Sequence, residues 1–198
     1  MDLGLTGKIA LVTGGSKGIG KGIARSLSAE GCRVALCART RSDLETAAAE
    51  ITGETGNEVA VFTADLTRPE DAAAFVEGAV GQFGCVDILV NNAGAAPGGV
   101  IETLTEDDWS ESLQLKFMGY VRCTKAVLPH MQRQGKGRIV NLIGNDGIKH
   151  SYWEIAPGAA NAAGQNFTMS MAGQYGKDNI SFVAVNPGPV RTERWDGL

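Results

Sequence analysis

Six short apolar runs alternate with longer segments of helical pattern, and this alternation constrains the fold more than any other feature of the sequence. The expected strands cover residues 8–13, 33–38, 58–63, 86–90, 137–142 and 180–185, and the expected helices cover 18–30, 42–54, 69–83, about 106–133 and 157–175. Strands that are joined through helices form a parallel sheet with helices on both faces. The sequence therefore predicts one α/β domain over residues 1–198, built on a doubly wound parallel sheet.

Composition and charge argue against several classes of partner. The 198 residues carry a net charge of −4 with scattered Lys and Arg, which argues against nucleic-acid binding. Without an apolar run of about 18 residues or a signal peptide, we expect no membrane contact and a cytoplasmic location. Four cysteines without C-x-x-C or Cys/His spacing predict no metal site, only thiols in a reducing compartment.

A glycine-rich turn joins the first expected strand to the first expected helix. Gly14, Gly18 and Gly20 stand there in G-x-x-x-G-x-G spacing. Glycine permits a sharp turn and close approach of the backbone to a phosphate, and the following helix N-terminus presents amide groups to it. The turn therefore predicts a site for the pyrophosphate of a dinucleotide, although a tight turn without a ligand would look the same.

Three further motifs follow expected strands in order. They are Asp65-Leu66-Thr67, Asn91-Asn92-Ala93-Gly94 and the stretch 186–192, Asn-Pro-Gly-Pro-Val-Arg-Thr. With the glycine turn, the whole chain resembles the short-chain dehydrogenase/reductase family. The resemblance implies a Rossmann-like fold, a nicotinamide dinucleotide cofactor and oxidoreductase activity. Family members usually continue well past the last motif, so we expect the C-terminal part of the family fold to be absent here.

The glycine turn, the end of the second expected strand and the resemblance together imply which residues bind the cofactor. They are Gly14, Ser16, Lys17, Gly18, Ile19, Gly20, Arg39, Asp65, Leu66, Asn92, Ala93, Gly94, Pro187, Gly188, Val190 and Thr192. Asp65 and Leu66 are expected at the adenine end, residues 92–94 along the adenosine, and the last four at the nicotinamide carboxamide. Asp65 could instead cap a helix, and Pro187-Gly188 could be an ordinary turn.

The end of the second expected strand bears on the choice of cofactor. A carboxylate there would bind the ribose 2′-hydroxyl of NAD, but Ala38 is followed by Arg39 and Arg41. These cations and Lys17 suit a 2′-phosphate, which favours NADP(H) over NAD(H). The alternative is that both arginines flank a solvated helix start.

The four catalytic positions of the family carry other residues in this chain. The Ser position falls on Gly144, the Tyr position on Pro157, the Lys position on Asn161 and the Asn position on Lys116. Asn and Lys thus appear exchanged between two helices. We hypothesise that Lys116 supplies the catalytic ammonium group from the opposite helix, the alternative being that it points to solvent.

The proton donor has no obvious replacement. Tyr152 lies in the long irregular stretch 144–156, near Lys149, and its phenol could swing to the substrate oxygen. Asn145 could take over the hydrogen bond of the missing Ser. The alternative is that Tyr152 and Trp153 pack this loop onto the sheet.

The sequence predicts an oxidoreductase that moves a hydride between NADP(H) and a small carbonyl or alcohol, with a non-standard proton relay. The alternatives are a catalytically inactive NADP(H)-binding sensor and a structural partner of an active relative. The small residues at 159–164 would let helices meet closely, and the resemblance implies a homodimer or homotetramer. Packing against the chain's own sheet would explain the same small residues.

Overall fold

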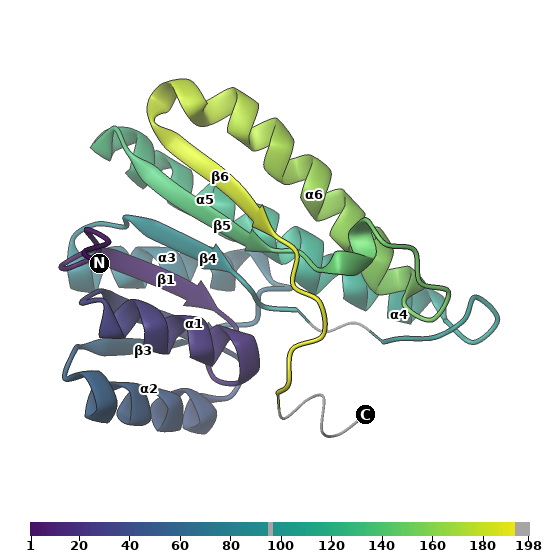
Figure 1. Cartoon of the computed structure of the whole chain (residues 1–198), viewed down its shortest axis with the longest axis horizontal. Coiled ribbons are helices and arrows are strands. Elements are labelled where there is room, and N and C mark those ends of the chain that lie inside the picture. Colours follow the sequence, from purple (N-terminus) through teal and green to yellow (C-terminus); the bar gives the residue numbers. More distant parts are fainter. Residues whose placement is uncertain (95–96, 193–198) are drawn as a thin grey trace.

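The computed structural model describes residues 1–94 and 97–192, which contain one six-stranded parallel sheet (Figure 1). The strands lie in the order β3-β2-β1-β4-β5-β6, and each pairs in parallel with its neighbours. Their bounds are β1 Ile9–Thr13, β2 Arg33–Ala38, β3 Val59–Thr63, β4 Ile88–Asn91, β5 Gly137–Leu142 and β6 Ile180–Val185. The predicted α/β class and parallel sheet are confirmed, and the strand order reverses direction between β1 and β4.

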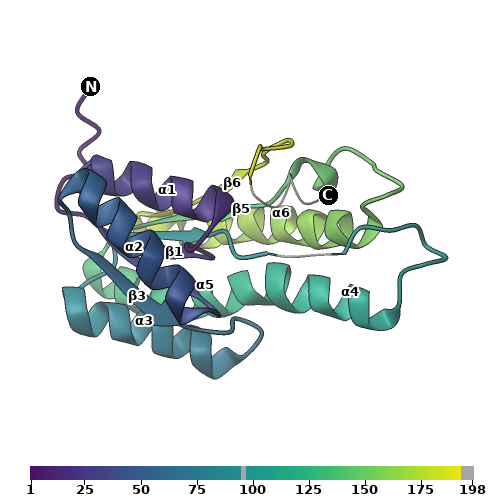
Figure 2. The ribbon, with the colours of Figure 1, turned by 90° about the horizontal axis from the view of Figure 1, so that it is seen from below.

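Helices cover both faces of the sheet (Figure 2). Their bounds are α1 Gly18–Ala29, α2 Arg41–Thr55, α3 Pro69–Phe83, α4 Glu106–Ser112, α5 Met118–Gln134 and α6 Ile155–Tyr175. One buried cluster joins α1 and α2 to one face, and a larger cluster joins α3, α5 and the end of α6 to the other. No helix in the described ranges is both long enough and apolar enough to cross a membrane.

The expected helix at 106–133 is not uniform. A capping box between Thr105 and Asp108 begins α4, and a π-helical turn, Leu113–Phe117, separates α4 from α5. A π turn holds one extra residue and changes the direction of the side chains on it, and such turns are frequent at functional sites. This turn carries Lys116, so the irregularity that periodicity did not predict lies at a residue of catalytic interest.

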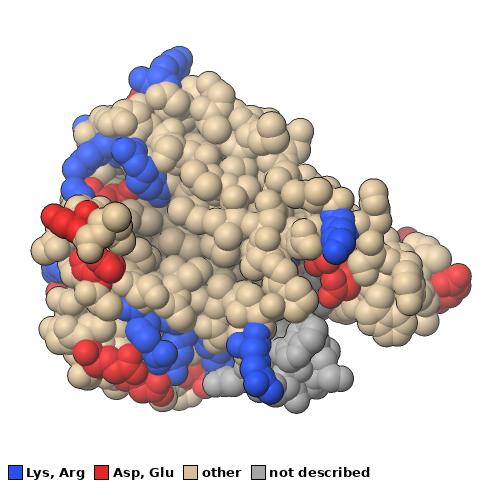
Figure 3. All heavy atoms as spheres, viewed as in Figure 1, with Lys and Arg blue, Asp and Glu red and all other residues tan. Residues whose placement is uncertain are grey.

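One part of the sheet differs from the expected double covering. Val183 and Val185 of β6 are 51% and 42% exposed, whereas Ile180 and Phe182 of the same strand are buried against the opposite layer. Figure 3 shows that the surface over β5 and β6 is almost without charged side chains. On this side the buried cluster beneath α1 and α2 extends as far as β5 but includes no residue of β6, which is why these valines remain exposed.

The small residues of α6 serve packing within the chain. Gly164 is buried, and a Cβ there would lie 2.7 Å from Cδ1 of Ile143. Ala160 is buried as well, while Ala159 and Ala162 on the other side of the helix are exposed. The alternative of packing on the chain's own sheet therefore explains part of the pattern. Assembly into a homodimer or homotetramer stays a prediction.

Candidate functional site

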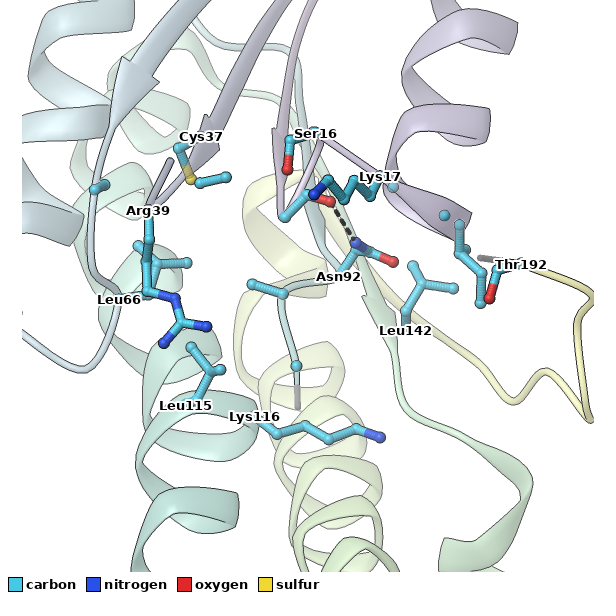
Figure 4. A pocket seen from close by; sticks show the side chains of 18 of the residues that line it. Ser16, Lys17, Cys37, Arg39, Leu66, Asn92, Leu115, Lys116, Leu142 and Thr192 are labelled. Atoms are coloured by element: carbon cyan, nitrogen blue, oxygen red, sulfur yellow. Dashed lines mark hydrogen bonds between the residues drawn. The ribbon is translucent and has the colours of Figure 1, made fainter. Parts of the chain in front are cut away.

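A cleft of about 960 Å³ opens at the carboxyl ends of β1 and β4, where the strand order reverses (Figure 4). This is where doubly wound sheets bind their ligands, and the volume suits a dinucleotide-sized molecule. The predicted site residues that line it are Gly14, Ser16, Lys17, Gly18, Ile19, Gly20, Arg39, Leu66, Asn92, Ala93, Gly94, Lys116, Pro187 and Thr192. Residues from six separate segments of the sequence thus meet in one cavity.

The glycine turn is held too tightly to accept side chains at two of its positions. Gly14 has φ +65°, and a Cβ there would lie 2.9 Å from the Cα of Ala93. A Cβ on Gly20 would lie 2.2 Å from the carbonyl oxygen of Gly14. The side chain of Lys17, at the N-cap of α1, makes no capping hydrogen bond to the helix. The first amides of α1 therefore form a cradle suited to a diphosphate.

Hydrogen bonds from the segment that follows β4 hold this cradle in shape. The backbone amides of Asn92 and Ala93 both donate to the hydroxyl of Thr13, at 2.9 Å each. The side-chain amide of Asn92 donates to the carbonyl oxygen of Thr13 at 2.9 Å and to that of Gly14 at 3.3 Å, the second of which is the dashed line in Figure 4. Asn92 therefore lines the cleft and also sets the shape of the turn.

Three predicted cofactor residues do not line this cleft. Gly188 and Val190 lie outside it, and Val190 borders a shallower groove beside α1 instead. The carboxylate of Asp65 accepts hydrogen bonds from the amide and hydroxyl of Thr67, at 3.0 and 2.8 Å. Asp65 therefore closes the turn before α3, whose N-cap is Arg68, rather than capping that helix directly.

The charge of Asp65 is stabilised by this turn. Burial raises the pKa of the carboxyl group, but the hydrogen bonds from Thr67 and the nearby charges of Arg39 and Arg68 outweigh burial and leave the pKa lowered. Arg39 lines the cleft, so the negative charge of Asp65 acts on one of the cations of the cleft.

Lys116 lies at the other end of the cleft. Its side chain extends past Gly94, where a Cβ would lie 3.3 Å from Cγ and 3.7 Å from Cε of the lysine. Figure 4 shows the ammonium group pointing to the side on which Leu142 and Thr192 lie, away from Arg39. Lys116 is half-buried and forms part of the cleft wall, and its catalytic role stays a prediction.

Gly144 and Asn161 are packed against each other beside this end. Gly144 lines the cleft with φ +125°, a conformation that side chains rarely adopt, and a Cβ there would lie 2.7 Å from Nδ2 of Asn161. Asn161 is 1% exposed, and neither polar atom of its side chain has a hydrogen-bond partner in the described parts of the chain. The absence of a side chain on Gly144 thus leaves the room that the amide of Asn161 occupies. Asn161 itself does not line the cleft.

Comparison with known proteins agrees with this geometry. A family model described as short chain dehydrogenase matches residues 8–198. The chain belongs to this family. The 3-oxoacyl-(acyl-carrier-protein) reductase FabG of Vibrio cholerae is 34% identical to this short-chain dehydrogenase over 196 residues, which are 99% of the chain and 79% of that reductase.

Solved structures of the family are similar over nearly the whole chain. L-Sorbose reductase from Gluconobacter frateurii, complexed with NADPH and L-sorbose, superposes with a TM-score of 0.95 at 33% identity, covering 98% of this chain and 74% of the reductase. Actinorhodin polyketide ketoreductase with NADPH gives a TM-score of 0.92 at 35% identity, covering 95% and 72%. Both are longer than the short-chain dehydrogenase described here.

No tyrosine is among the described residues that line this cleft, so nothing there replaces the catalytic tyrosine that the resemblance implies. Pro157 is buried in the first turn of α6. Tyr152 is 81% exposed and does not line the cleft, and the carbonyl oxygen of Trp153 accepts a 2.7 Å hydrogen bond from the amide of Gly99. The loop is therefore tied to the 97–104 segment. The alternative that Tyr152 packs onto the sheet is wrong, because its ring is exposed.

Asn145 serves the backbone of the same loop. Its amide donates to the carbonyl oxygen of Pro187 at 3.1 Å, and its own carbonyl accepts from the amides of Ile148 and Lys149. Asn145 joins the loop after β5 to the segment after β6 and is not part of the cleft wall. Of the four predicted catalytic residues, the structure places only Lys116 in the cleft.

Two charged residues of the cleft were not predicted. Asp43 in the first turn of α2 lies beside Lys17, and Glu111 of α4 also lines the cleft. Both stand in acidic segments of ordinary helices, so no sequence motif distinguishes them. The π turn that carries Lys116 is likewise not revealed by periodicity.

Proposed function

We propose that this short-chain dehydrogenase binds NADP(H) in the cleft and catalyses hydride transfer between the cofactor and a small carbonyl or alcohol substrate. The observation that carries the proposal is one continuous cavity with the glycine cradle and two cations at one end and Lys116 at the other. The NADPH complexes of similar reductases support the choice of cofactor.

The residues present fit this cofactor. The amides of the glycine turn would hold the diphosphate, because a Cβ on Gly20 would close the cradle. Arg39 and Lys17 would contact the 2′-phosphate, since a guanidinium and an ammonium group both complement it. Pro187 and Thr192 would lie along the nicotinamide end.

When bound, NADPH supplies the hydride that reduces a carbonyl carbon, and NADP⁺ accepts it in the reverse direction. Lys116 is the cation placed to complement negative charge on the substrate oxygen and to hold a proton near it. Tyr152 could join this relay only if the loop at 148–154 folded toward the cleft, because its phenol is exposed here. We therefore assign the main role in the non-standard relay to Lys116.

A catalytically inactive NADP(H)-binding protein is the second candidate function. Gly144 and Pro157, which occupy the Ser and Tyr positions implied by the resemblance, carry no hydroxyl group. The glycine turn would nevertheless still suit a dinucleotide. Retention of that turn beside these replacements is the specific observation that favours a sensor.

Two measurements separate the candidates. NADPH fluorescence on mixing with the purified protein reports binding, and loss of absorbance with a panel of ketones, aldehydes and quinones reports turnover. Binding followed by turnover supports the reductase, and binding without any turnover supports the sensor. If neither coenzyme binds, both functions are wrong.

The role of Lys116 is tested by Lys116→Met, which keeps the length of the side chain and removes the charge. We expect kcat to fall by about 100-fold or more with NADPH affinity changed less than about threefold. The matched control is Lys125→Met, an exposed lysine of the adjoining α5 that does not line the cleft. Equal kcat values in the two variants would contradict the assignment, and unchanged rates in Tyr152→Phe would exclude the phenol from the relay.

A further inference from the structure

The adenosine end of the cleft contains a carboxylate beside its cations. Asp43 Oδ2 lies 2.9 Å from Nζ of Lys17, and both side chains line the cleft together with Arg39 and Thr40. The side chain of Asp43 is 32% exposed and that of Lys17 is 59% exposed. Figure 4 shows Lys17 entering from the glycine turn and Arg39 from the end of β2. The ion pair therefore lies at the edge of the place where a 2′-phosphate would bind.

Asp43 is not needed to dock α1 against α2. Two other ion pairs already join these helices, Lys21 to Glu50 at 2.6 Å and Arg25 to Glu54 at 2.8 Å. Neither Glu50 nor Glu54 lines the cleft. Asp43 differs from them because its charge is directed to the ligand site, so its main consequence is for what binds there.

The carboxylate partly neutralises the cations of this subsite. Lys17 is paired with Asp43, and the charge of Arg39 acts on Asp65, whose pKa remains lowered even though burial raises it. A 2′-phosphate carries about −1.5 to −2 charges, so a carboxylate nearby repels it. A ribose 2′-hydroxyl can instead donate a hydrogen bond to a carboxylate.

We propose that Asp43 is a specificity-determining residue that weakens the preference of this cleft for NADP(H) over NAD(H). The inference rests on the proposed cofactor function and adds to it. Lys17 and Arg39 favour the phosphorylated coenzyme, Asp43 opposes them, and the chain therefore accepts both coenzymes with modest discrimination. The discrimination is a balance of three charges rather than a property of the arginine alone.

The test is Asp43→Asn, which keeps the shape of the side chain and removes its charge. Dissociation constants for NADPH and NADH are measured at low salt, together with those of adenosine 2′,5′-bisphosphate and AMP as probes of the adenosine end. We expect NADPH and the bisphosphate to bind about three- to tenfold more tightly, and NADH and AMP to bind equally or more weakly. The gain should shrink at high salt because the charges are partly exposed.

Glu45→Gln is the matched control, because it removes the same charge from the same helix. Glu45 pairs with Arg41 at 2.6 Å, and neither residue lines the cleft, although the sequence had suggested Arg41 for the 2′-phosphate, so both coenzymes should change by less than about twofold. Lys17→Met should weaken NADPH binding more in the Asp43→Asn background than in the wild type, because Lys17 is then no longer neutralised by Asp43. Far-ultraviolet circular dichroism confirms that each variant is folded.

The outcomes distinguish this inference from the function beneath it. An unchanged NADPH/NADH ratio in folded Asp43→Asn overturns the inference and leaves the proposed function intact. Weaker NADPH binding in that variant also overturns it, because it would mean that Asp43 positions Lys17 for the phosphate. Failure of the wild-type protein to bind either coenzyme overturns the proposed function and this inference with it.

Discussion

The two ends of the cleft differ in how much of the family pattern they keep. At the adenosine end the glycine turn, Asn92 and Arg39 all line the cleft. At the other end Gly144 and Asn161 occupy the positions that the resemblance assigns to two catalytic groups, and Lys116, in the π turn, forms part of the wall. The first end is shaped mainly by backbone contacts, whereas the second is shaped by which side chains fit together.

This difference explains why one end has little freedom to change and the other has more. A Cβ on Gly20 would collide with backbone that belongs to the turn itself, so no neighbouring substitution can relieve it. A side chain on Gly144 would collide with the amide of Asn161, which another substitution can shorten. Changes at the second end can therefore occur in compensating pairs. The three predictions below test this contrast, beginning with the largest expected effect.

Gly20→Ala should abolish cofactor binding. The new Cβ would lie 2.2 Å from the carbonyl oxygen of Gly14 and 2.4 Å from Nδ2 of Asn92, which deforms the cradle. We expect NADPH affinity, measured by fluorescence titration, to fall by about 100-fold or more. Gly22→Ala on the same helix is the control, because nothing lies within 4 Å of a Cβ there. That control should bind NADPH normally. Its free energy of unfolding should be about 0.5–1 kcal/mol higher than that of the wild type. Normal NADPH binding by Gly20→Ala would show that the glycine turn is not a rigid cradle.

Gly144→Ser should destabilise the protein without restoring activity. Both φ +125° and the contact with Asn161 oppose a side chain, and together we expect them to cost about 2–3 kcal/mol in the free energy of unfolding by urea. In an Asn161→Ala background the contact disappears and only the backbone strain remains, so the cost should fall to about 1–2 kcal/mol. Additive effects in this double-mutant cycle would show that the two positions are independent.

Asp65→Asn should have a smaller, pH-dependent effect on stability and leave cofactor affinity unchanged. Because the folded-state pKa of Asp65 is lowered, its charge stabilises the fold above the unfolded-state pKa near 4, and this contribution is lost as the pH falls below it. We expect a difference of about 1 kcal/mol at pH 7 that shrinks toward pH 3, measured by urea unfolding. Glu102→Gln, in an exposed loop, should show no comparable difference. A large loss of NADPH affinity in Asp65→Asn would mean that Asp65 contacts the cofactor after all.

Much of the fold was predictable because its signals are local. The predicted strands at 33–38, 137–142 and 180–185 and the helix at 69–83 agree with the structure residue for residue. Alternating periodicity and turn residues are properties of neighbouring residues along the chain. The glycine turn was predictable for the same reason, since its chemistry depends on a strand, a turn and a helix in immediate succession.

The catalytic end was much less predictable. Tyr152 lies in the expected loop, but the sequence does not show that its ring is exposed or that the neighbouring Trp153 is tied to Gly99. Asp43 and Glu111 are ordinary acidic residues of helices until the fold brings their side chains to the cleft. These facts depend on contacts between segments that are distant in the sequence, and a motif carries no information about such distances.

By itself, the sequence determined the order of the elements, the parallel sheet and the cradle for a diphosphate, because each follows from hydrogen bonding and sterics within short segments. The tertiary structure alone decided that Lys116 lines the cleft, that Asn161 lies behind Gly144, and that a carboxylate stands beside the cations of the adenosine end. A side chain's direction and charge environment arise only when separate elements pack together.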